Sequence, residues 1–171
     1  INNKLNISLC GMMGSGKSVI GKLLSKKMQL PLLDIDNELE TIMQMSITQI
    51  FNDFGENRFR LIESTFFKEC TKLNNCIYAT GGGIVIDKNN QSILKNRGVS
   101  IFLDCSADII IQRIKNDIHS RPLLSNNYKK EIKQLYKDRF AIYKSCSEHI
   151  IDTSDLPKEQ IVKKITEYLN A

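Results

Sequence analysis

The sequence has no tryptophan and only three prolines among its 171 residues, and no apolar run approaches the ~18 residues that cross a membrane. No signal-peptide pattern stands at its start, and its five cysteines form an odd set without a CxxC pair. These absences argue against membrane contact and against a zinc site, and they predict a protein of the reducing cytoplasm. A basic stripe interleaved with aromatic residues is also missing, so the sequence gives no sign of a nucleic-acid partner.

What the sequence does contain is typical of one ordinary globular domain. Hydrophobic residues make up 42% of the chain and charged residues 25%, which is enough apolar material to fill a core and to exclude intrinsic disorder. The length fits a single domain over residues 1–171, and no internal repeat or flexible linker divides it. The formal net charge of +5 suits an anionic ligand without identifying one.

Apolar runs of strand length alternate with segments of helical spacing. Strands are expected over residues 5–10, 32–35, 76–79, 100–103 and 149–152. Helices are expected over residues 17–28, 37–43, 47–54, 57–71, 86–96, 107–114, 129–146 and 155–169. Strands that alternate with helices form parallel sheets covered on both faces, so the pattern predicts a three-layer α/β/α domain with ligands at the carboxyl ends of the strands.

The eight residues from position 11 read GMMGSGKS and match the phosphate-loop pattern G-x-x-x-x-G-K-[ST]. Gly11, Gly14 and Gly16 allow successive N–H groups to converge on one anion, and the helix that follows adds the positive end of its dipole. Lys17 would reach the β- and γ-phosphates, and the Ser18 hydroxyl is a hard oxygen ligand for Mg²⁺. A simple glycine turn is the alternative. The strand before the loop and the helix after it favour a nucleoside triphosphate site.

Two carboxylates, Asp34 and Asp36, end the second expected strand. Residues two apart in an extended chain point to the same side, so this pair would orient hydrated Mg²⁺ and take a proton from an attacking hydroxyl. The alternative is that one of the two only caps the helix expected at 37–43. The sequence favours the first interpretation and leaves the second open.

Arginine is scarce, with six residues against eighteen lysines, so its positions are informative. Arg60 and Glu63, three apart on a helix, would form an ordinary surface ion pair. Arg113 would complement a helix dipole, and Arg139 would pack on a helix surface. Arg121 stands in a polar loop, where it would either lie in solvent or act as a mobile clamp on a phosphate. No single arginine decides between a structural and a functional role.

Thr80 and three consecutive glycines, Gly81, Gly82 and Gly83, directly follow the third expected strand. Consecutive glycines let a ligand or a loop approach the backbone closely, which a plain tight turn rarely requires. Together with the phosphate loop and the carboxylate pair, this segment indicates a kinase that acts on a small acceptor with a hydroxyl group. Whether the acceptor also carries a carboxylate stays open at this point.

Taken in order, these motifs resemble the bacterial-type shikimate kinase family, and the resemblance covers essentially the whole chain. It rests on Gly11–Ser18, Asp34-x-Asp36, Phe51, Gly55-Glu56, Phe59-Arg60-x-x-Glu63, Gly81–Gly83, Arg121-Pro122-Leu123-Leu124, Arg139 and Tyr143. It implies ATP-dependent phosphorylation of the 3-hydroxyl of shikimate to shikimate 3-phosphate and ADP, a step toward chorismate and the aromatic amino acids. It also implies a fold like that of the nucleoside monophosphate kinases, with a five-stranded parallel sheet, a lid at about 115–128 and an acceptor-binding region at about 35–64.

The resemblance also implies roles for individual residues. Catalysis would depend on Lys17, Asp36 and Arg121, with Asp36 as the base. Mg²⁺ would be held by Ser18 and, through water, by Asp34. The nucleotide would contact Gly14, Ser15, Gly16, Lys17, Ser18, Val19, Arg113 and Arg121, with the segment 152–157 near the adenine. Shikimate would contact Asp36, Phe51, Phe59, Arg60, Glu63, Gly81, Gly82, Gly83 and Arg139.

Within that set, Arg60 and Arg139 would hold the substrate carboxylate, and Glu63 would fix Arg60. Two features depart from the family's pattern: Val19 stands where the family often has Thr, and the expected lid is short and rich in asparagine. Two other functions stay open, namely a kinase of the same fold for gluconate or a nucleoside monophosphate, and a regulatory module that binds a nucleotide without transferring phosphate. We expect a monomer whose partners are the small molecules ATP and shikimate.

Overall fold

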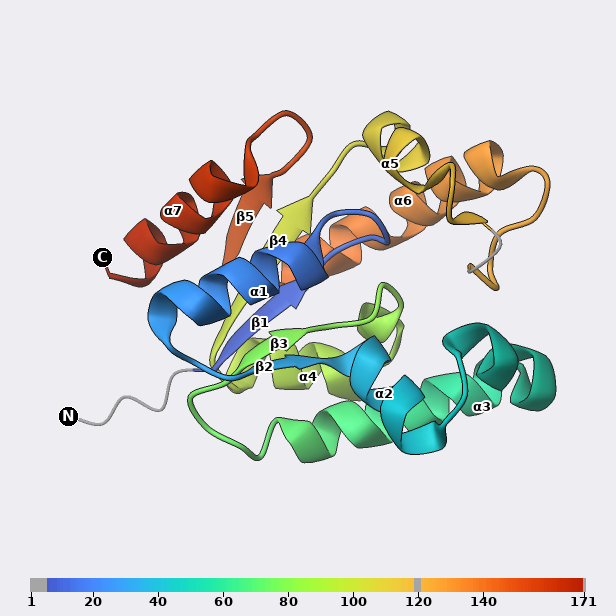
Figure 1. The fold of residues 1–171 in the computed structure, drawn as a ribbon, viewed down its shortest axis with the longest axis horizontal. Helices are drawn as coiled ribbons and strands as arrows, with labels where there is room; N and C mark the ends of the chain where they lie inside the picture. Colours follow the sequence, from blue (N-terminus) through green and yellow to red (C-terminus); the bar gives the residue numbers. More distant parts are fainter. Residues whose placement is uncertain (1–5, 119–120, 171) are drawn as a thin grey trace.

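The structure, a computed structural model, describes residues 6–118 and 121–170, and in this part of the chain five parallel strands form one sheet (Figure 1). The strands are β1 (Ile7–Cys10), β2 (Leu32–Asp34), β3 (Ile77–Ala79), β4 (Val99–Asp104) and β5 (His149–Asp152). Their order across the sheet is β2-β3-β1-β4-β5, so the strand that leads into the phosphate loop lies at the centre. In this register, Ile7 lies beside Ile77 of β3 and Val99 of β4.

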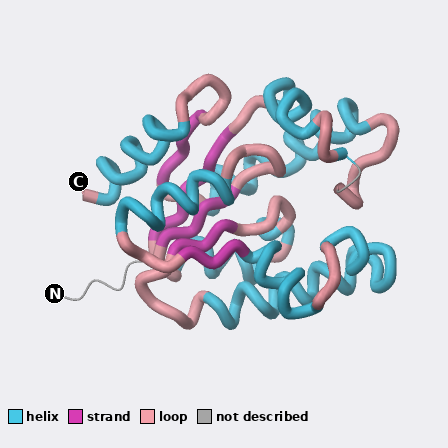
Figure 2. The backbone as a smooth tube through the Cα atoms, viewed as in Figure 1, coloured by secondary structure: helices cyan, strands magenta, loops and turns pink. Residues whose placement is uncertain are grey.

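Helices cover both faces of the sheet, and Figure 2 shows the strands enclosed between them. They are α1 (Lys17–Met28), α2 (Ile35–Met43), α3 (Ile47–Cys70), α4 (Lys88–Asn96), α5 (Ala107–Ile114), α6 (Tyr128–Cys146) and α7 (Lys158–Leu169). Helices α1 and α7 pack against one face, and α3, α4 and α6 pack against the other.

Side chains of the central strand alternate between two hydrophobic cores. Ile7 and Leu9 belong to the core closed by α1 and α7, whereas Cys10 belongs to the core that contains Phe67 of α3 and Tyr143 of α6. All five cysteines are buried free thiols. Two cores on opposite faces of one parallel sheet make a three-layer α/β/α domain, and this confirms the predicted fold class.

The path from β2 into α2 differs from the one expected. The strand expected at 32–35 ends at Asp34, and the helix expected at 37–43 begins at Ile35. The reason is local: the Asp34 side chain accepts a hydrogen bond from the backbone N–H of Asn37 at 3.4 Å and thereby caps α2.

Other boundaries also differ, and the last helix, expected from residue 155, begins at Lys158. The helices expected at 47–54 and 57–71 form the single element α3, which breaks at Gly55 (φ 77°, ψ 165°). The helix expected to begin at residue 86 begins at Lys88, because the chain first makes a 3₁₀ turn, η1 (Ile84–Ile86). The strand expected at 5–10 begins at Ile7, and residue 5 lies outside the described residues.

The carboxyl ends of the strands face one side of the molecule, where α2, the first part of α3 and the segment 121–127 project beyond the sheet (Figure 1). Residues 119–120 of the lid expected at about 115–128 lie outside the described residues. Of the helices described, none combines the length and the apolar character needed to span a bilayer.

Candidate active site

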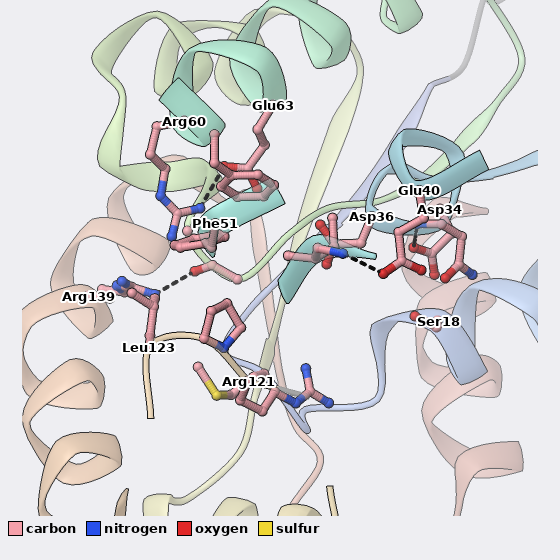
Figure 3. Close-up of a pocket in the computed structure, with 17 residues that line it drawn as sticks. Ser18, Asp34, Asp36, Glu40, Phe51, Arg60, Glu63, Arg121, Leu123 and Arg139 are labelled. Atoms are coloured by element: carbon pink, nitrogen blue, oxygen red, sulfur yellow. Dashed lines mark hydrogen bonds and ion pairs between the residues drawn. The ribbon is translucent and has the colours of Figure 1, made fainter. Parts of the chain in front are cut away.

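Two cavities share a wall at the carboxyl ends of β1, β2 and β3. The first, here called the loop cavity, has a volume of about 520 Å³ and is lined by most of the phosphate loop. The second, here called the helix cavity, has a volume of about 370 Å³ and lies between α2, α3, α6 and the segment after Arg121 (Figure 3). The common wall consists of Met13, Ser18, Asp34, Asp36, Gly82 and Arg121. Groups bound in the two cavities would therefore meet at these residues.

Lys17 is the buried cation of the loop cavity. Its Nζ donates to the carbonyl oxygens of Gly11 (2.9 Å) and Met12 (2.8 Å), and the residue is only 9% exposed. Burial lowers the pKa of Lys17 to about 8, although the nearby Asp36 carboxylate favours the charged form. A phosphate in the loop would favour the charged form further and give Nζ a stronger acceptor than a neutral carbonyl.

The phosphate loop enters α1 at Gly16, the N-cap residue, whose φ of 98° disfavours a side chain. The hydroxyl oxygen of Ser15 is buried without a hydrogen-bond partner. Val19 is half exposed beside the loop cavity, and Ser18 is exposed in the common wall. The predicted nucleotide contacts Gly14, Ser15, Gly16, Lys17, Ser18, Val19, Arg113 and Arg121 all line the loop cavity.

Arg113 contributes more than a charge at the end of α5. Its Nη1 donates to Gly14 O at 3.2 Å and its Nη2 to Thr153 O at 2.7 Å, which fixes the guanidinium beside the loop cavity. The buried Thr153 hydroxyl in turn contacts Asp104 O (2.8 Å) and Ser15 O (3.2 Å), so it ties the phosphate loop to β4. Sequence reasoning missed Thr153 as an individual residue. Its position directly after β5, at the carboxyl end of a strand, is the signal that could have identified it.

Asp34 and Asp36 both lie in the common wall, but the geometry expected for them is wrong. Asp36 belongs to the first turn of α2, so no extended chain aligns the two carboxylates. Oδ1 of Asp34 caps α2, whereas its Oδ2 is buried without a partner. Capping therefore uses one oxygen and leaves the other for a ligand. Burial raises the pKa of Asp36, and the Lys17 ammonium opposes this effect most strongly.

Arg60 and Glu63 form a largely buried pair, so their interpretation as a surface ion pair is wrong. Arg60 Nη1 donates to Glu63 Oε2 at 2.7 Å, and the two side chains are 18% and 1% exposed. The outer edge of the guanidinium, Nε and Nη2, reaches the exposed Glu56 Oε1 at 3.4 and 3.3 Å. The guanidinium carbon also lies 5.7 and 5.1 Å from the ring centroids of Phe51 and Phe59, which line the helix cavity with it (Figure 3).

Gly81 and Gly83, which follow β3, are needed because charged side chains occupy the space that a Cβ would take. An unusual backbone conformation is not the reason at Gly83. A Cβ on Gly81 would collide with Glu63 Oε1 and lie 2.8 Å from Asp36 Oδ1. A Cβ on Gly83 would overlap with the guanidinium of Arg60, although the φ of −101° at Gly83 suits any residue. As the sequence predicts, other groups approach the backbone of these glycines closely. The groups that do so in the structure are the side chains of Glu63, Asp36 and Arg60.

Arg139 is buried in the helix cavity and does not merely pack on the surface of α6. It is 6% exposed, and its Nη1 donates to Gly82 O at 3.1 Å. The hydroxyl of Tyr143, one turn further along α6, donates to the same carbonyl. Arg60 and Arg139 thus bring two cations to one small cavity, next to a backbone segment fixed by α6.

Arg121 lines both cavities, and its Nε is buried without a hydrogen-bond partner. Pro122 and Leu123 follow it along the wall of the helix cavity. The interpretation that Arg121 lies in solvent is therefore wrong. Its guanidinium instead stands in the wall where the two cavities meet.

Four buried side-chain atoms in the described part of the chain lack any hydrogen-bond partner: Ser15 Oγ, Asp34 Oδ2, Glu63 Oε1 and Arg121 Nε. All four belong to residues that line the two cavities. An unpaired buried polar group costs about 1–3 kcal/mol, so native proteins seldom keep one without a reason. Their concentration here indicates a site built for polar ligands.

Sequence reasoning also missed several residues of the cavity walls. Met13 lies inside the phosphate-loop motif, so its position in that motif could have identified it. Glu40 and Ile47 line the helix cavity, where Glu40 Oε1 accepts a hydrogen bond from the backbone N–H of Ile47 at 2.8 Å and joins α2 to α3. No motif in the sequence marks these two residues, because their roles depend on how α2 meets α3.

The residues of the common wall fit a Mg²⁺ ion that is held mainly by phosphate oxygens. Ser18 offers an exposed hydroxyl, and Asp34 Oδ2 is a carboxylate oxygen without another partner. The described residues contain no group of three or more His, Cys, Asp or Glu side chains that could hold a metal by themselves. Mg²⁺ is typically bound by one or two carboxylates together with phosphates and water, which is what these donors allow.

Comparison with known proteins gives a consistent result. A family model described as shikimate kinase matches residues 13–170. The shikimate kinase of Caldicellulosiruptor saccharolyticus is 40% identical over 161 residues, which cover 94% of this chain and 92% of the relative. The shikimate kinase of Enterococcus faecalis is 36% identical over 165 residues, with coverage of 96% and 98%.

Solved structures agree with the sequence matches. The shikimate kinase from Acinetobacter baumannii in complex with shikimate superposes with a TM-score of 0.94 at 31% identity. The superposition covers 98% of this chain and 93% of the A. baumannii chain. The shikimate kinase from Aquifex aeolicus has a TM-score of 0.85 at 34% identity, with coverage of 97% and 96%. A deoxyadenosine kinase from M. mycoides, with a TM-score of 0.66 at 20% identity, shares the fold alone.

Proposed function

The chain belongs to the shikimate kinase family, and we propose that its two cavities perform the reaction of that family, the ATP-dependent phosphorylation of the 3-hydroxyl of shikimate. ATP occupies the loop cavity and shikimate occupies the helix cavity. The products are ADP and shikimate 3-phosphate, and the reaction belongs to aromatic amino acid biosynthesis.

The loop cavity binds ATP through backbone and cation together. The N–H groups at the start of α1 point to the phosphates and add the positive end of the helix dipole. Lys17 Nζ exchanges the carbonyls of Gly11 and Met12 for phosphate oxygens. The guanidinium of Arg113, fixed by the carbonyls of Gly14 and Thr153, offers a planar face for the adenine.

The helix cavity binds shikimate through its carboxylate, its ring and its hydroxyls. Arg60 and Arg139 hold the carboxylate, and the planar fork of each guanidinium matches a carboxylate better than a lysine would. Phe51 and Phe59 cover the ring from the side of α3. Asp36, in the wall toward ATP, accepts hydrogen bonds from the hydroxyls.

Phosphoryl transfer then runs in line across the common wall, without a phosphoenzyme. Asp36 aligns the 3-hydroxyl and receives its proton as the oxygen bonds to the γ-phosphorus, while the bond from the γ-phosphorus to the bridging oxygen of ADP breaks and ADP leaves. Lys17 and Arg121 stabilise the charge that spreads over the transferred oxygens, because catalysis of this kind depends on positioning and electrostatics. Mg²⁺, held by Ser18 and through water by Asp34, supplies further positive charge at the phosphates when it is bound.

The segment around Arg121 serves as a lid, within the range 115–128, and residues 35–64 form the acceptor-binding region. Closure of the lid over both substrates excludes water and limits the hydrolysis of ATP. Pro122 and Leu123 add an apolar cover to the helix cavity. We further propose that the protein acts as a monomer in the cytoplasm, with no nucleic acid as a partner.

The observation that carries this proposal is the position of Asp36. It stands in the wall between the cavities, where Lys17, Arg60 and Arg121 all act on its charge. This location suits a base that must meet both the acceptor hydroxyl and the γ-phosphate.

The test measures ADP release from Mg-ATP with shikimate, gluconate or nucleoside monophosphates as acceptors. Release that depends on shikimate is the expected result. Release with another acceptor would retain the ATP site and refute the acceptor. ATP binding without release for any acceptor would favour a regulatory module.

A further inference from the structure

Glu63 has an unusual electrostatic environment beside the helix cavity. Its side chain is 1% exposed, its Oε2 accepts a hydrogen bond from Arg60 Nη1 at 2.7 Å, and its Oε1 has no partner. The charged groups that act on it are Arg60 on its own helix, Asp36 from α2 and Arg139 from α6, and the titratable Tyr143 hydroxyl of α6 also interacts with it. The turn after β3 places the uncharged Gly81 against its free oxygen.

The free oxygen of Glu63 faces a second carboxylate. The position that a Cβ on Gly81 would take lies 2.8 Å from Asp36 Oδ1 and closer still to Glu63 Oε1. The two oxygens are therefore no more than about 5 Å apart, a distance at which two negative charges disfavour each other. Two ionised carboxylates here would each offer only acceptors. A proton on Glu63 Oε1 removes the repulsion and turns the unpartnered oxygen into a donor directed toward Asp36.

Shikimate adds one more negative charge to the same group of residues. In the proposed function, on which this inference rests, its carboxylate binds Arg60 and Arg139, the two cations that stabilise an ionised Glu63. We propose that Glu63 takes up a proton from the solvent when shikimate binds, so that the substrate carboxylate replaces Glu63 as the anion that these arginines neutralise. Glu63 is thus a positioning residue, and Asp36 remains ionised to act as the base.

The direction of the pH dependence follows from the free protein. Burial raises the pKa of Glu63 to about 7, with Arg60 opposing the shift. Well below pH 7, Glu63 is already neutral and shikimate binds without proton uptake. Above pH 7, Glu63 is ionised and must be protonated, so shikimate affinity falls by up to about tenfold per pH unit until the pKa of the complex is passed.

The experiment is titration calorimetry of shikimate into the full chain, in MES and in imidazole buffer at about pH 6 and in HEPES and in Tris buffer at about pH 8. The two buffers of each pair differ in ionisation enthalpy, so the difference in heat counts the protons taken up. The wild type should take up at most about one proton per shikimate near pH 8 and almost none near pH 6. The variant Glu63→Gln should bind shikimate without uptake. The matched control Glu56→Gln removes the exposed carboxylate on the same arginine and should keep the uptake.

A second measurement covers the case in which Glu63→Gln does not fold. Difference infrared spectroscopy of the wild type should show a protonated carboxyl band on shikimate binding, shifted by ¹³C-labelled glutamate and not by ¹³C-labelled aspartate. The proposal is wrong if, at about pH 8, Glu63→Gln takes up as many protons as the wild type or the wild type binds shikimate without uptake. It is also wrong if only labelled aspartate shifts the band. A wild type that does not bind shikimate at all would refute the proposed function instead.

Discussion

Gly16 in the phosphate loop and Gly83 in the turn after β3 both border the site, and each excludes a side chain for a different reason. At Gly16 the nearest atom to an added Cβ is Ile20 Cγ1, at an ordinary distance of 3.8 Å, but the φ of 98° is one that side chains rarely adopt. At Gly83 the φ of −101° is ordinary, but the guanidinium of Arg60 fills the space of a Cβ. Conformation requires the first glycine, and packing requires the second.

In the proposed function, the difference reflects how each cavity would recognise its ligand. The loop cavity would bind phosphate through backbone N–H groups, so the path of the backbone would itself be the recognition element. The helix cavity presents the side-chain charges of Arg60, Glu63 and Arg139, so room for these groups decides its shape. Damage in the first region should therefore appear in ATP binding, and damage in the second should appear in shikimate binding alone.

The largest effect that separates the two regions is expected for Lys17→Ala. In the proposed function, loss of the buried ammonium removes a donor to the transferred phosphoryl group, which should lower kcat by about 10²–10³-fold. Shikimate binding, measured by calorimetry without nucleotide, should stay close to that of the wild type. The control Lys22→Ala removes an exposed lysine of the same helix and should leave turnover unchanged. A Lys17→Ala variant with normal turnover would refute the phosphate site.

A smaller effect, confined to the helix cavity, is expected for Gly83→Ala. The added methyl group must displace the Arg60 guanidinium, and such overpacking typically costs about 1–3 kcal/mol. Because Arg60 is expected to bind the shikimate carboxylate, we expect this cost to appear as weaker shikimate binding. The affinity for ATP should not change. The double variant Gly83→Ala/Arg60→Ala provides the control, because the methyl group should cost little once the guanidinium is gone. Equal losses of affinity in both backgrounds would show that Arg60 is not the obstacle.

Gly16→Ala should weaken ATP binding and leave shikimate binding unchanged, which is the opposite of Gly83→Ala, and its free-energy cost should be smaller. A left-handed conformation costs a residue with a Cβ about 1–2 kcal/mol, which should appear as a lower melting temperature and weaker ATP binding. Shikimate affinity should remain at the wild-type level. Gly16→Asn should lose less than Gly16→Ala, because asparagine tolerates this conformation better. Identical losses of ATP affinity in the two variants would show that lack of space for a side chain, and not the backbone conformation, requires glycine at position 16. Gly16 and Gly83 would then not differ in the way described above.

The same contrast explains what the sequence could predict and what it could not. The phosphate loop is local: its eight consecutive residues carry the conformation, so a pattern in the sequence identifies it. The helix cavity depends on contacts between distant segments, such as the hydrogen bond from Arg139 to Gly82, 57 positions away. Without those contacts, Arg60 and Glu63 at helical spacing look like an ordinary surface pair. The misjudged geometry of Asp36 has a related cause, because capping by Asp34 starts α2 before the strand reaches Asp36.

The smallest expected effect tests how far recognition by the loop extends beyond its backbone. Val19 is 50% exposed beside the loop cavity, at the position where the family often has a threonine. Val19→Thr keeps the shape of the side chain and adds a hydroxyl, and one further hydrogen bond to a phosphate contributes about 0.5–1.5 kcal/mol. ATP should therefore bind about two- to tenfold more tightly by calorimetry, with shikimate affinity unchanged. Val19→Ala, which shortens the side chain without adding a hydroxyl, should not improve binding. If Val19→Thr binds ATP no better than the wild type, no phosphate oxygen lies within reach of position 19, and recognition by the loop rests on its backbone, Lys17 and Ser18.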